Sequence, residues 1–186
     1  MVPVLSLLIP IALSAVFVFI ASSIIHMATP WHNNDLALVP DEDGVMNALR
    51  PFNIPPGDYA MPKASSMKQM QSPEFVAKFK AGPVAFMTVR PNGEMSMSRS
   101  LILWFIYSLV VSMVAGYIAG VAFGPGAEYL RIFQVAGCVA FAGYALGQAH
   151  ESIWWGRSWG RTFRNMAVGL LYGLLTGGTF GWLWPR

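Results

Sequence analysis

The sequence predicts an all-α membrane protein with four transmembrane helices and a proline-rich, mostly irregular segment between the first and second helices. Three observations support this fold class. Of the 186 residues, 55 % are hydrophobic and only 11 % are charged, whereas soluble domains usually carry about 25 % charged residues. The most apolar residues gather in four blocks, and Arg131 at the start of the third is the only Asp, Glu, Lys or Arg within them. Nine of the 13 prolines lie between residues 26 and 100.

Each apolar block is close to the roughly 20 residues that a helix needs to cross the hydrocarbon core of a bilayer. We therefore expect transmembrane helices over residues 1–25, 101–123, 130–149 and 166–184. No Lys or Arg precedes Arg50, whereas a cleaved signal peptide begins with a basic region. We interpret the first block as a retained helix for this reason.

The basic residues predict the orientation of the spans. Residues 26–100 and the basic loop 150–165 share one face of a four-span protein, and they carry ten of the 12 Lys and Arg residues. The positive-inside rule places this face in the cytoplasm and both termini in the periplasm. Tryptophans, which favour the headgroup level, are expected to anchor the helix ends. The predicted anchors are Trp31, Trp154, Trp155, Trp159, Trp182 and Trp184, and Trp104 fits the same interpretation.

The segment 26–100 is expected to form a loop-rich cytoplasmic cap, because its many prolines disfavour long helices. Within it, the acidic run from residue 40 predicts a short helix to residue 49. Ser72 followed by Pro73 is typical of a helix start, and this basic helix either rests on anionic headgroups or is solvated. Residues 83–89 alternate as a strand does, and Asn92-Gly93 predicts a tight turn and a small hairpin.

Small residues recur at every fourth position in three of the expected spans. This spacing places them on one ridge of a helix, where they allow another backbone to approach closely. The glycines are Gly116, Gly120 and Gly124 in the second span, Gly143 and Gly147 in the third, and Gly169, Gly173, Gly177 and Gly181 in the fourth. The stripes serve either packing among the chain's own helices or docking of a partner, and we expect at least one to face a partner.

Residues with catalytic chemistry are scarce. No Asp, Glu, Lys, Arg or His lies in the middle of a span, which disfavours a pump or an ion-coupled transporter. No phosphate loop, dinucleotide fingerprint, nucleophile elbow or HExxH motif occurs, so we expect no enzyme. The basic residues flank the spans, so they do not indicate nucleic-acid binding.

Three histidines remain as candidates for metal or pigment binding. His26, His32 and His150 share the predicted cytoplasmic face with Asp35 and Glu151, and imidazole with carboxylate suits several divalent ions. His26 follows the small residue Ser22 by one turn and could ligate a chlorin or haem. The alternative is simple hydrogen bonding at the interface. We predict no cofactor, although lipids or pigments could bind at helix surfaces.

The stretches SSIIHMATPWHNND, PDEDGVMNALRP, SPEF, GPVAFMTV and GTFGWLWP resemble a family of small bacterial integral membrane proteins without an established activity. The resemblance extends from His26 to Trp184 and implies a location in the bacterial cytoplasmic membrane. It implies no catalytic residues.

The expected function is that of a non-enzymatic accessory subunit, which docks to and stabilises a larger membrane complex in the lipid bilayer. Photosynthetic assemblies (reaction centre or light harvesting) and respiratory assemblies recruit such subunits, so we favour that setting by analogy. One alternative is a small-solute transporter or channel with a hydrated path lined by Ser108 and Ser112. A second alternative is a histidine-based metal or pigment protein.

Overall fold

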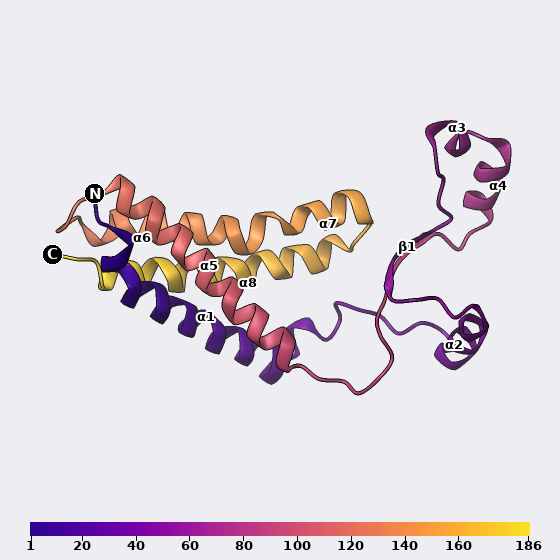
Figure 1. The fold of residues 1–186 in the computed structure, drawn as a ribbon, viewed down its shortest axis with the longest axis horizontal. Helices are drawn as coiled ribbons and strands as arrows, with labels where there is room; N and C mark the ends of the chain where they lie inside the picture. Colours follow the sequence, from indigo (N-terminus) through magenta and orange to yellow (C-terminus); the bar gives the residue numbers. More distant parts are fainter. The chain divides into compact units, whose positions relative to one another are not determined.

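The computed structural model describes residues 1–186, and the chain divides into two units. The helical unit comprises Met1–Ala37 and Ser96–Arg186, and the inserted unit comprises Leu38–Met95. Figure 1 shows the long helices of the helical unit running side by side, with both chain termini at the same end of that unit.

The helical unit contains four long helical stretches. The first is the 3₁₀ turn η1 (Val4–Leu7) continued by α1 (Leu8–Ala28), and a second 3₁₀ turn, η2 (Pro30–His32), follows it. The others are α5 (Ser98–Ala122), the run of α6 (Tyr129–Phe141), the π-helical turn η4 (Ala142–Leu146) and α7 (Gln148–Trp155), and finally α8 (Trp159–Trp182).

Three of these stretches are long and apolar enough to cross a membrane, namely Val4–Ala28, Ser98–Ala122 and Tyr129–Trp155. By length and composition, these three helices have the character of membrane spans. Helix α8 has 24 residues but is not among the three. Arg161, Arg164 and Asn165 in its first turns, and glycines and threonines further along, lower its mean hydropathy.

The prediction of a basic loop over residues 150–165 is wrong, because most of these residues are helical. Helix α7 extends to Trp155 and α8 begins at Trp159, which leaves only residues 156–158 as a turn. Gly156 has a φ of 66°, the left-handed conformation that commonly ends a helix. Charged residues marked the end of the apolar blocks, but they do not end a helix, because helices continue beyond the apolar layer.

Small residues hold the helices of this unit close together. A Cβ atom on Gly177 would lie 2.5 Å from the Phe133 carbonyl oxygen, and one on Gly120 would lie 2.5 Å from that of Val2. Helices α6 and α8 therefore meet backbone to backbone, and the N-terminus meets α5 in the same way. The Val2 amide also donates a hydrogen bond to the Gly120 carbonyl at 2.8 Å.

The serines expected to line a hydrated path are fully buried. Ser108 bonds back to the Trp104 carbonyl, as is common in membrane helices. The Ser112 hydroxyl instead accepts a hydrogen bond of 2.9 Å from Ser14 on α1, so it joins two helices. The Thr176 hydroxyl on α8 is buried and has no hydrogen-bond partner.

The inserted unit contains short elements joined by loops. They are α2 (Glu42–Leu49), the 3₁₀ turn η3 (Arg50–Phe52), β1 (Gly57–Met61), α3 (Met67–Met70), α4 (Pro73–Ala81) and β2 (Ala85–Val89). The predicted helix start is confirmed, because the Ser72 hydroxyl accepts from the Phe75 amide at 3.2 Å. The segment is irregular in part, but it carries more regular structure than its proline content predicts.

The predicted hairpin around Asn92-Gly93 is wrong, although the strand itself is confirmed. Strand β2 pairs antiparallel with β1, which precedes it by 23 residues, and Tyr59 lies opposite Met87. Residues after Gly93 lead directly into α5 and form no strand. A turn signal is local, whereas a strand also needs a partner with strand-forming residues, and Gly57–Met61 supplies it.

Candidate functional site

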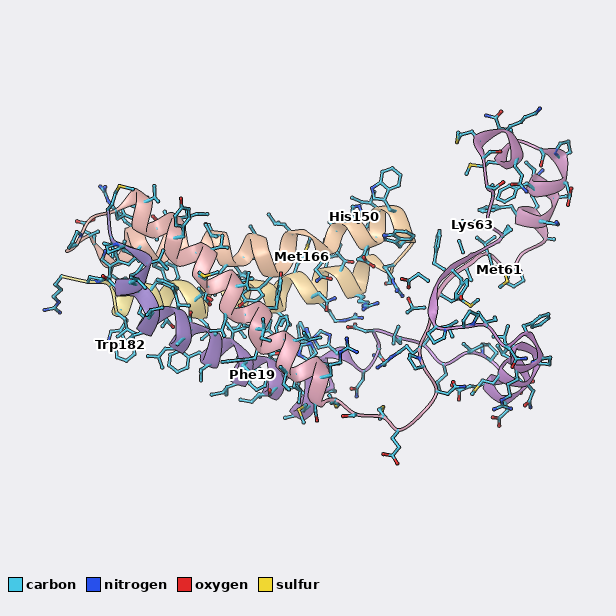
Figure 2. The ribbon with its side chains drawn as sticks, in the orientation of Figure 1. Phe19, Met61, Lys63, His150, Met166 and Trp182 are labelled. Atoms are coloured by element: carbon cyan, nitrogen blue, oxygen red, sulfur yellow. The ribbon has the colours of Figure 1, made fainter.

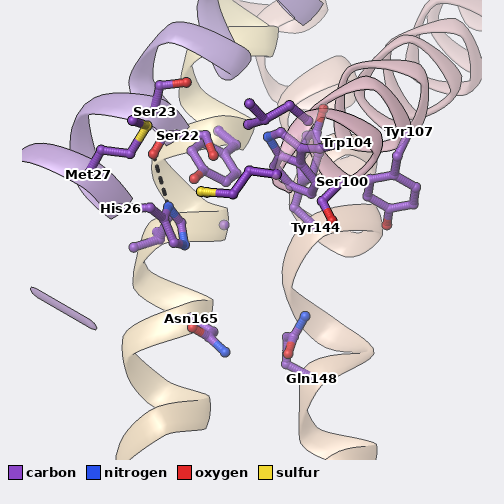
Figure 3. Close-up of a pocket in the computed structure, with 15 residues that line it drawn as sticks. Ser22, Ser23, His26, Met27, Ser100, Trp104, Tyr107, Tyr144, Gln148 and Asn165 are labelled. Atoms are coloured by element: carbon purple, nitrogen blue, oxygen red, sulfur yellow. Dashed lines mark hydrogen bonds between the residues drawn. The ribbon is translucent and has the colours of Figure 1, made fainter. Parts of the chain in front are cut away.

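A cavity of about 490 Å³ opens in the helical unit where α1 ends and α5 begins (Figure 3). Its walls come from the last turns of α1, the first turns of α5, the junction of η4 with α7, and the first half of α8. This volume lies within the range of about 300–1,000 Å³ that is typical of small-molecule sites. The lining residues are Ser22, Ser23, His26, Met27, Met97, Ser100, Leu101, Trp104, Tyr107, Tyr144, Gln148, Asn165, Val168, Gly169 and Tyr172.

The lining contains no Asp, Glu, Lys or Arg. Its polar groups are neutral hydroxyls, two carboxamides (Gln148 and Asn165), an indole and an imidazole. Burying a charged ligand is costly unless a protein charge is paired with it. The cavity is therefore suited to a neutral molecule.

Aromatic rings form one side of the cavity. Trp104 lies at their centre, with its ring centroid 5.7 Å from that of Tyr107 and 5.9 Å from those of Tyr144 and Tyr172. The Tyr107 hydroxyl donates to the Gly143 carbonyl at 2.6 Å, which links α5 to η4. These contacts hold the rings in fixed orientations, and ring faces of this kind pack well against other flat, apolar groups.

Two side chains among the lining residues carry polar atoms that are buried beneath the cavity surface. These atoms are the Trp104 Nε1 and the Tyr172 hydroxyl oxygen. The Ser22 hydroxyl lies next to that of Tyr172. The polar groups of the other lining residues are the hydroxyls, the two carboxamides and the imidazole.

His26 supplies the imidazole of the cavity. Its Nδ1 lies 2.9 Å from the Ser22 carbonyl oxygen, and Figure 3 shows this bond. A carbonyl only accepts, so the hydrogen lies on Nδ1 and Nε2 remains available for another contact. The His26 ring stacks on His32, with centroids 4.2 Å apart and planes 9° apart.

His32 connects the cavity to an ion pair. Its Nδ1 lies 2.6 Å from Asp35 Oδ2, and Asp35 Oδ1 accepts from Arg164 Nε at 2.9 Å and Nη2 at 2.5 Å. Burial raises the pKa of Asp35, but hydrogen bonds and charge interactions with His32 and Arg164 outweigh it and hold the pKa below its usual 3.8. The carboxylate is therefore ionised at neutral pH and ties η2 to the start of α8.

The residues expected to form a metal site are not brought together. His26 and His32 stack, but no group of three or more His, Cys, Asp or Glu side chains is arranged to hold a metal ion. The His150 side chain is exposed on α7, and Glu151 pairs with Arg157 at 3.7 Å. The predicted five-residue cluster is therefore corrected to a two-histidine stack with Asp35 attached.

Most of the glycine stripes pack inside the helical unit. Gly169, Gly173, Gly177 and Gly181 on α8 face Ala145, Gly137, Phe133 and Tyr129. Gly116 faces Phe180, Gly120 faces Val2, and Gly143 faces Val111. Only Gly124 and Gly147 have open space where a Cβ would lie. The chain's own helices thus account for most of the small-residue pattern.

Five of the six predicted tryptophan anchors are exposed on the helical unit, namely Trp31, Trp154, Trp155, Trp159 and Trp182. Figure 2 shows Trp182 and His150 at opposite ends of this unit. Trp184 differs, because only 7 % of it is exposed and its Nε1 donates to the Gly124 carbonyl at 3.0 Å. It is part of the core rather than an exposed anchor.

Sequence reasoning missed the cavity. It placed Trp104 at the interface and assigned no role to Tyr144, Tyr172, Gln148 or Asn165. One available signal was the presence of aromatic rings with polar tips inside uncharged spans, where each buried tip needs a partner.

Comparison with known proteins finds no matching family model, no matching curated protein and no matching solved structure. The function is therefore inferred from the geometry of the helical unit. Its most distinctive feature is the cavity with an uncharged lining.

Proposed function

We propose that the chain is a non-enzymatic integral membrane protein that binds a small neutral molecule in the cavity of its helical unit. The observation that carries this proposal is a cavity of about 490 Å³ whose lining contains no charged residue. Small-molecule sites are typically concave and mostly apolar, with a few polar groups that orient the ligand. The carboxamides of Gln148 and Asn165 are such groups in this lining.

The position of the cavity favours a ligand that dissolves in the membrane. The lining includes residues from the last turns of α1 and the first turns of α5. Both helices are long and apolar enough to span a bilayer. The flexible thioethers of Met27 and Met97 contribute to its lining and adapt readily to apolar groups of different shape.

Purification of the full chain in mild detergent, followed by native mass spectrometry and analysis of the organic extract, tests this function. We expect a stoichiometric small molecule that is lost or reduced in a Gln148→Leu, Asn165→Leu double variant, which removes two polar groups of the lining. The matched control is Tyr117→Phe, because Tyr117 is exposed on α5 and does not line the cavity. Ligand-free protein, or equal retention in all variants, would overturn the proposal.

We further propose that α8 is a fourth span and that the protein lies in the bacterial cytoplasmic membrane. The close packing of Gly173 against the Gly137 carbonyl keeps α8 beside α6, which itself is long and apolar enough to cross. With four spans, the concentration of Lys and Arg in residues 26–100 favours a cytoplasmic inserted unit and periplasmic termini.

Cysteine labelling tests this topology. In a Cys138→Ser background, a cysteine introduced by Asn92→Cys is expected to react with a membrane-impermeant maleimide only after the cells are lysed. Reaction of Asn92→Cys in intact cells would reverse the proposed orientation. A cysteine introduced by Arg186→Cys, at the C-terminus, is the matched control and should react in cells with a permeable outer membrane.

An accessory-subunit function remains a second proposal, and the surface of the inserted unit favours it. No residue of Leu38–Met95 is fully buried, and the side chains of Leu38 and Phe52 are 87 % and 73 % exposed. A partner protein that covers these side chains would remove their apolar surface from water. A larger photosynthetic or respiratory complex could supply the cover, and co-purification from native membranes without crosslinking is the test. A free monomer would contradict it.

A further inference from the structure

We infer that helix α4 of the inserted unit lies on the surface of a bilayer that contains anionic lipids. Three observations lead to this contact: the order of side chains around the helix, the exposure of its apolar side, and the surplus of lysine in the surrounding chain. The contact is independent of the cavity and of its ligand. It requires only that α1 and α5, the long helices before and after the inserted unit, span the membrane.

Apolar and basic side chains occupy separate sectors around α4. Successive residues advance by about 100° around an α-helix. The order around the helix axis is therefore Lys78, Phe75, Phe79, Val76 and Lys80. The three apolar side chains span an arc of about 100°, and one lysine lies on either side of that arc. Helices that lie in a membrane interface show this arrangement, because lysine stems extend along apolar surface while their ammonium groups reach the headgroups.

The inserted unit does not cover the apolar side of α4. Phe79 and Val76 are 50 % and 38 % exposed. The Phe75 ring lies beside that of Phe79, with centroids 6.1 Å apart. These three side chains form an apolar strip that stays in contact with water unless another surface covers it. Removing the apolar strip from water supplies one part of the binding free energy.

The chain around α4 is strongly basic. Residues 61–90 contain four Lys and one Arg but a single acid, Glu74, which gives a net charge of +4. Residues 38–60 contain four acids and one Arg, which gives a net charge of −3. The positive surplus is therefore confined to the part of the inserted unit that contains α3 and α4. An anionic bilayer complements this charge, because it attracts each Lys or Arg near its surface.

The ion pair of α4 does not neutralise this charge. Lys78 Nζ lies 2.8 Å from Glu74 Oε1, and these side chains are 64 % and 79 % exposed. An exposed pair at this spacing is weak, so Lys78 can exchange its partner for a lipid phosphate. Lys80 and Lys68, the latter on α3, have no carboxylate partner. Three lysines are thus available to headgroups.

The attachment of the inserted unit to two long helices favours lipid as the partner of α4. A free helix of nine residues is barely stable in water and would gain little by binding alone. The inserted unit ends at Met95, and α5 begins at Ser98. Contact with the bilayer is therefore intramolecular and occurs at high effective concentration. The bilayer is also the anionic surface that both attachments bring within reach.

Quenching of a fluorescent label by lipids tests the contact in the full chain. In a Cys138→Ser background, a cysteine introduced by Val76→Cys carries a nitrobenzoxadiazole label on the apolar strip. Ala77→Cys, on the opposite side of α4, is the matched control. Each labelled chain is reconstituted in nanodiscs of phosphatidylcholine, with or without an equal amount of phosphatidylglycerol, and doxyl groups on acyl chains act as the quencher. We expect phosphatidylglycerol to strengthen quenching at Val76→Cys at least about twofold, and to exceed its effect at Ala77→Cys.

Two double variants identify the charges that are responsible. Lys78→Gln, Lys80→Gln removes both lysines that flank the apolar strip and should reduce the gain from phosphatidylglycerol about threefold or more. Arg131→Gln, Arg186→Gln removes the same amount of charge from the helical unit and should leave the gain unchanged. Salt at about 1 M shortens the screening length to about 3 Å and should also reduce the gain.

The outcomes distinguish lipid from other partners of α4. Equal quenching at Val76→Cys and Ala77→Cys, or equal quenching with and without phosphatidylglycerol, would overturn the contact with anionic lipid. Absence of lipid quenching, together with protection of Val76→Cys from a soluble maleimide in native membranes, would assign the apolar strip to a partner protein and overturn it as well. The small molecule of the cavity is measured separately in the organic extract, so its presence or absence is unaffected by either result.

Discussion

Arg164 Nη2 lies 2.5 Å from Asp35 Oδ1, although 129 residues separate the two in the chain. The contact fixes the turn that follows α1 against the first turns of α8, and the stacked His32 and His26 lie beside it. Because His26 lines the cavity, the ion pair also determines the position of one cavity wall.

Loss of this ion pair should destabilise the helical unit. The Asp35 side chain is 13 % exposed, and Asp35→Asn would leave Arg164 and His32 without their anionic partner. We expect a loss of about 1–3 kcal/mol in unfolding free energy, the usual range for a hydrogen bond to a charged group. Glu74→Gln is the control, because the Glu74–Lys78 pair is exposed at the surface. Thermal unfolding in detergent at pH 7 measures both.

The same ion pair should make the protein less stable as the pH falls into the acidic range. The pKa of Asp35 in the folded protein lies below its usual 3.8. The ionised Asp35 therefore contributes fully to stability at any pH above the pKa that it has in the unfolded chain. This contribution is lost as the pH falls through the lower pKa that Asp35 has in the folded protein. We expect the difference in melting temperature between the wild type and Asp35→Asn to be constant from pH 7 to 5 and to shrink below about pH 4. A difference that grew on acidification would contradict this assignment.

The glycine stripes predict a graded response to added methyl groups. A Cβ on Gly177 or Gly120 would lie 2.5 Å from a backbone carbonyl oxygen, which cannot move without shifting a helix or the N-terminus. Gly177→Ala and Gly120→Ala should each cost about 1–3 kcal/mol, the usual range for overpacking. Gly124→Ala and Gly147→Ala meet no atom within 4 Å and should be neutral. If Gly147→Ala instead impaired assembly with another protein, that glycine would be a docking position.

Local signals in the sequence predicted local structure well. Ser72 followed by Pro73 placed the start of α4 correctly, because a capping hydroxyl and a restricted φ act within one turn. The Asn92-Gly93 turn signal failed, because the strand 85–89 pairs with residues 57–61 across two intervening helices. No local pattern near residue 92 contains that partner.

The candidate site depended on relations between helices that the sequence leaves open. The small residues of α8 were predicted to form a packing ridge, and they do, against α6. The cavity arises because Trp104, Tyr144 and Tyr172 come from three helices and are rotated toward one another. Hydropathy gives each span's length but not its rotation about its own axis, so the convergence of these rings could not be read from the sequence.

The hydrogen bond between Ser14 and Ser112 should contribute a small, measurable coupling. It joins α1 and α5 at 2.9 Å, and both side chains are fully buried. Double-mutant cycles on comparable bonds in a membrane protein average about 0.6 kcal/mol. We expect a coupling near that value from Ser14→Ala, Ser112→Ala and the double variant. A coupling of zero would mean that each hydroxyl is equally satisfied by its own helix.

Removing the hydroxyl of Thr176 should affect stability in the opposite direction to removing the paired hydroxyls of Ser14 and Ser112. Its hydroxyl is fully buried on α8 and has no hydrogen-bond partner, and it lies outside the cavity. Valine has nearly the same shape and removes the unpaired group, so Thr176→Val should leave stability unchanged or raise it by up to about 1 kcal/mol. Ser112→Ala, which deletes a paired hydroxyl, is the matched control and should lower stability. A loss in Thr176→Val comparable to that of Ser112→Ala would show that the threonine hydroxyl has a partner in the membrane, such as an ordered water.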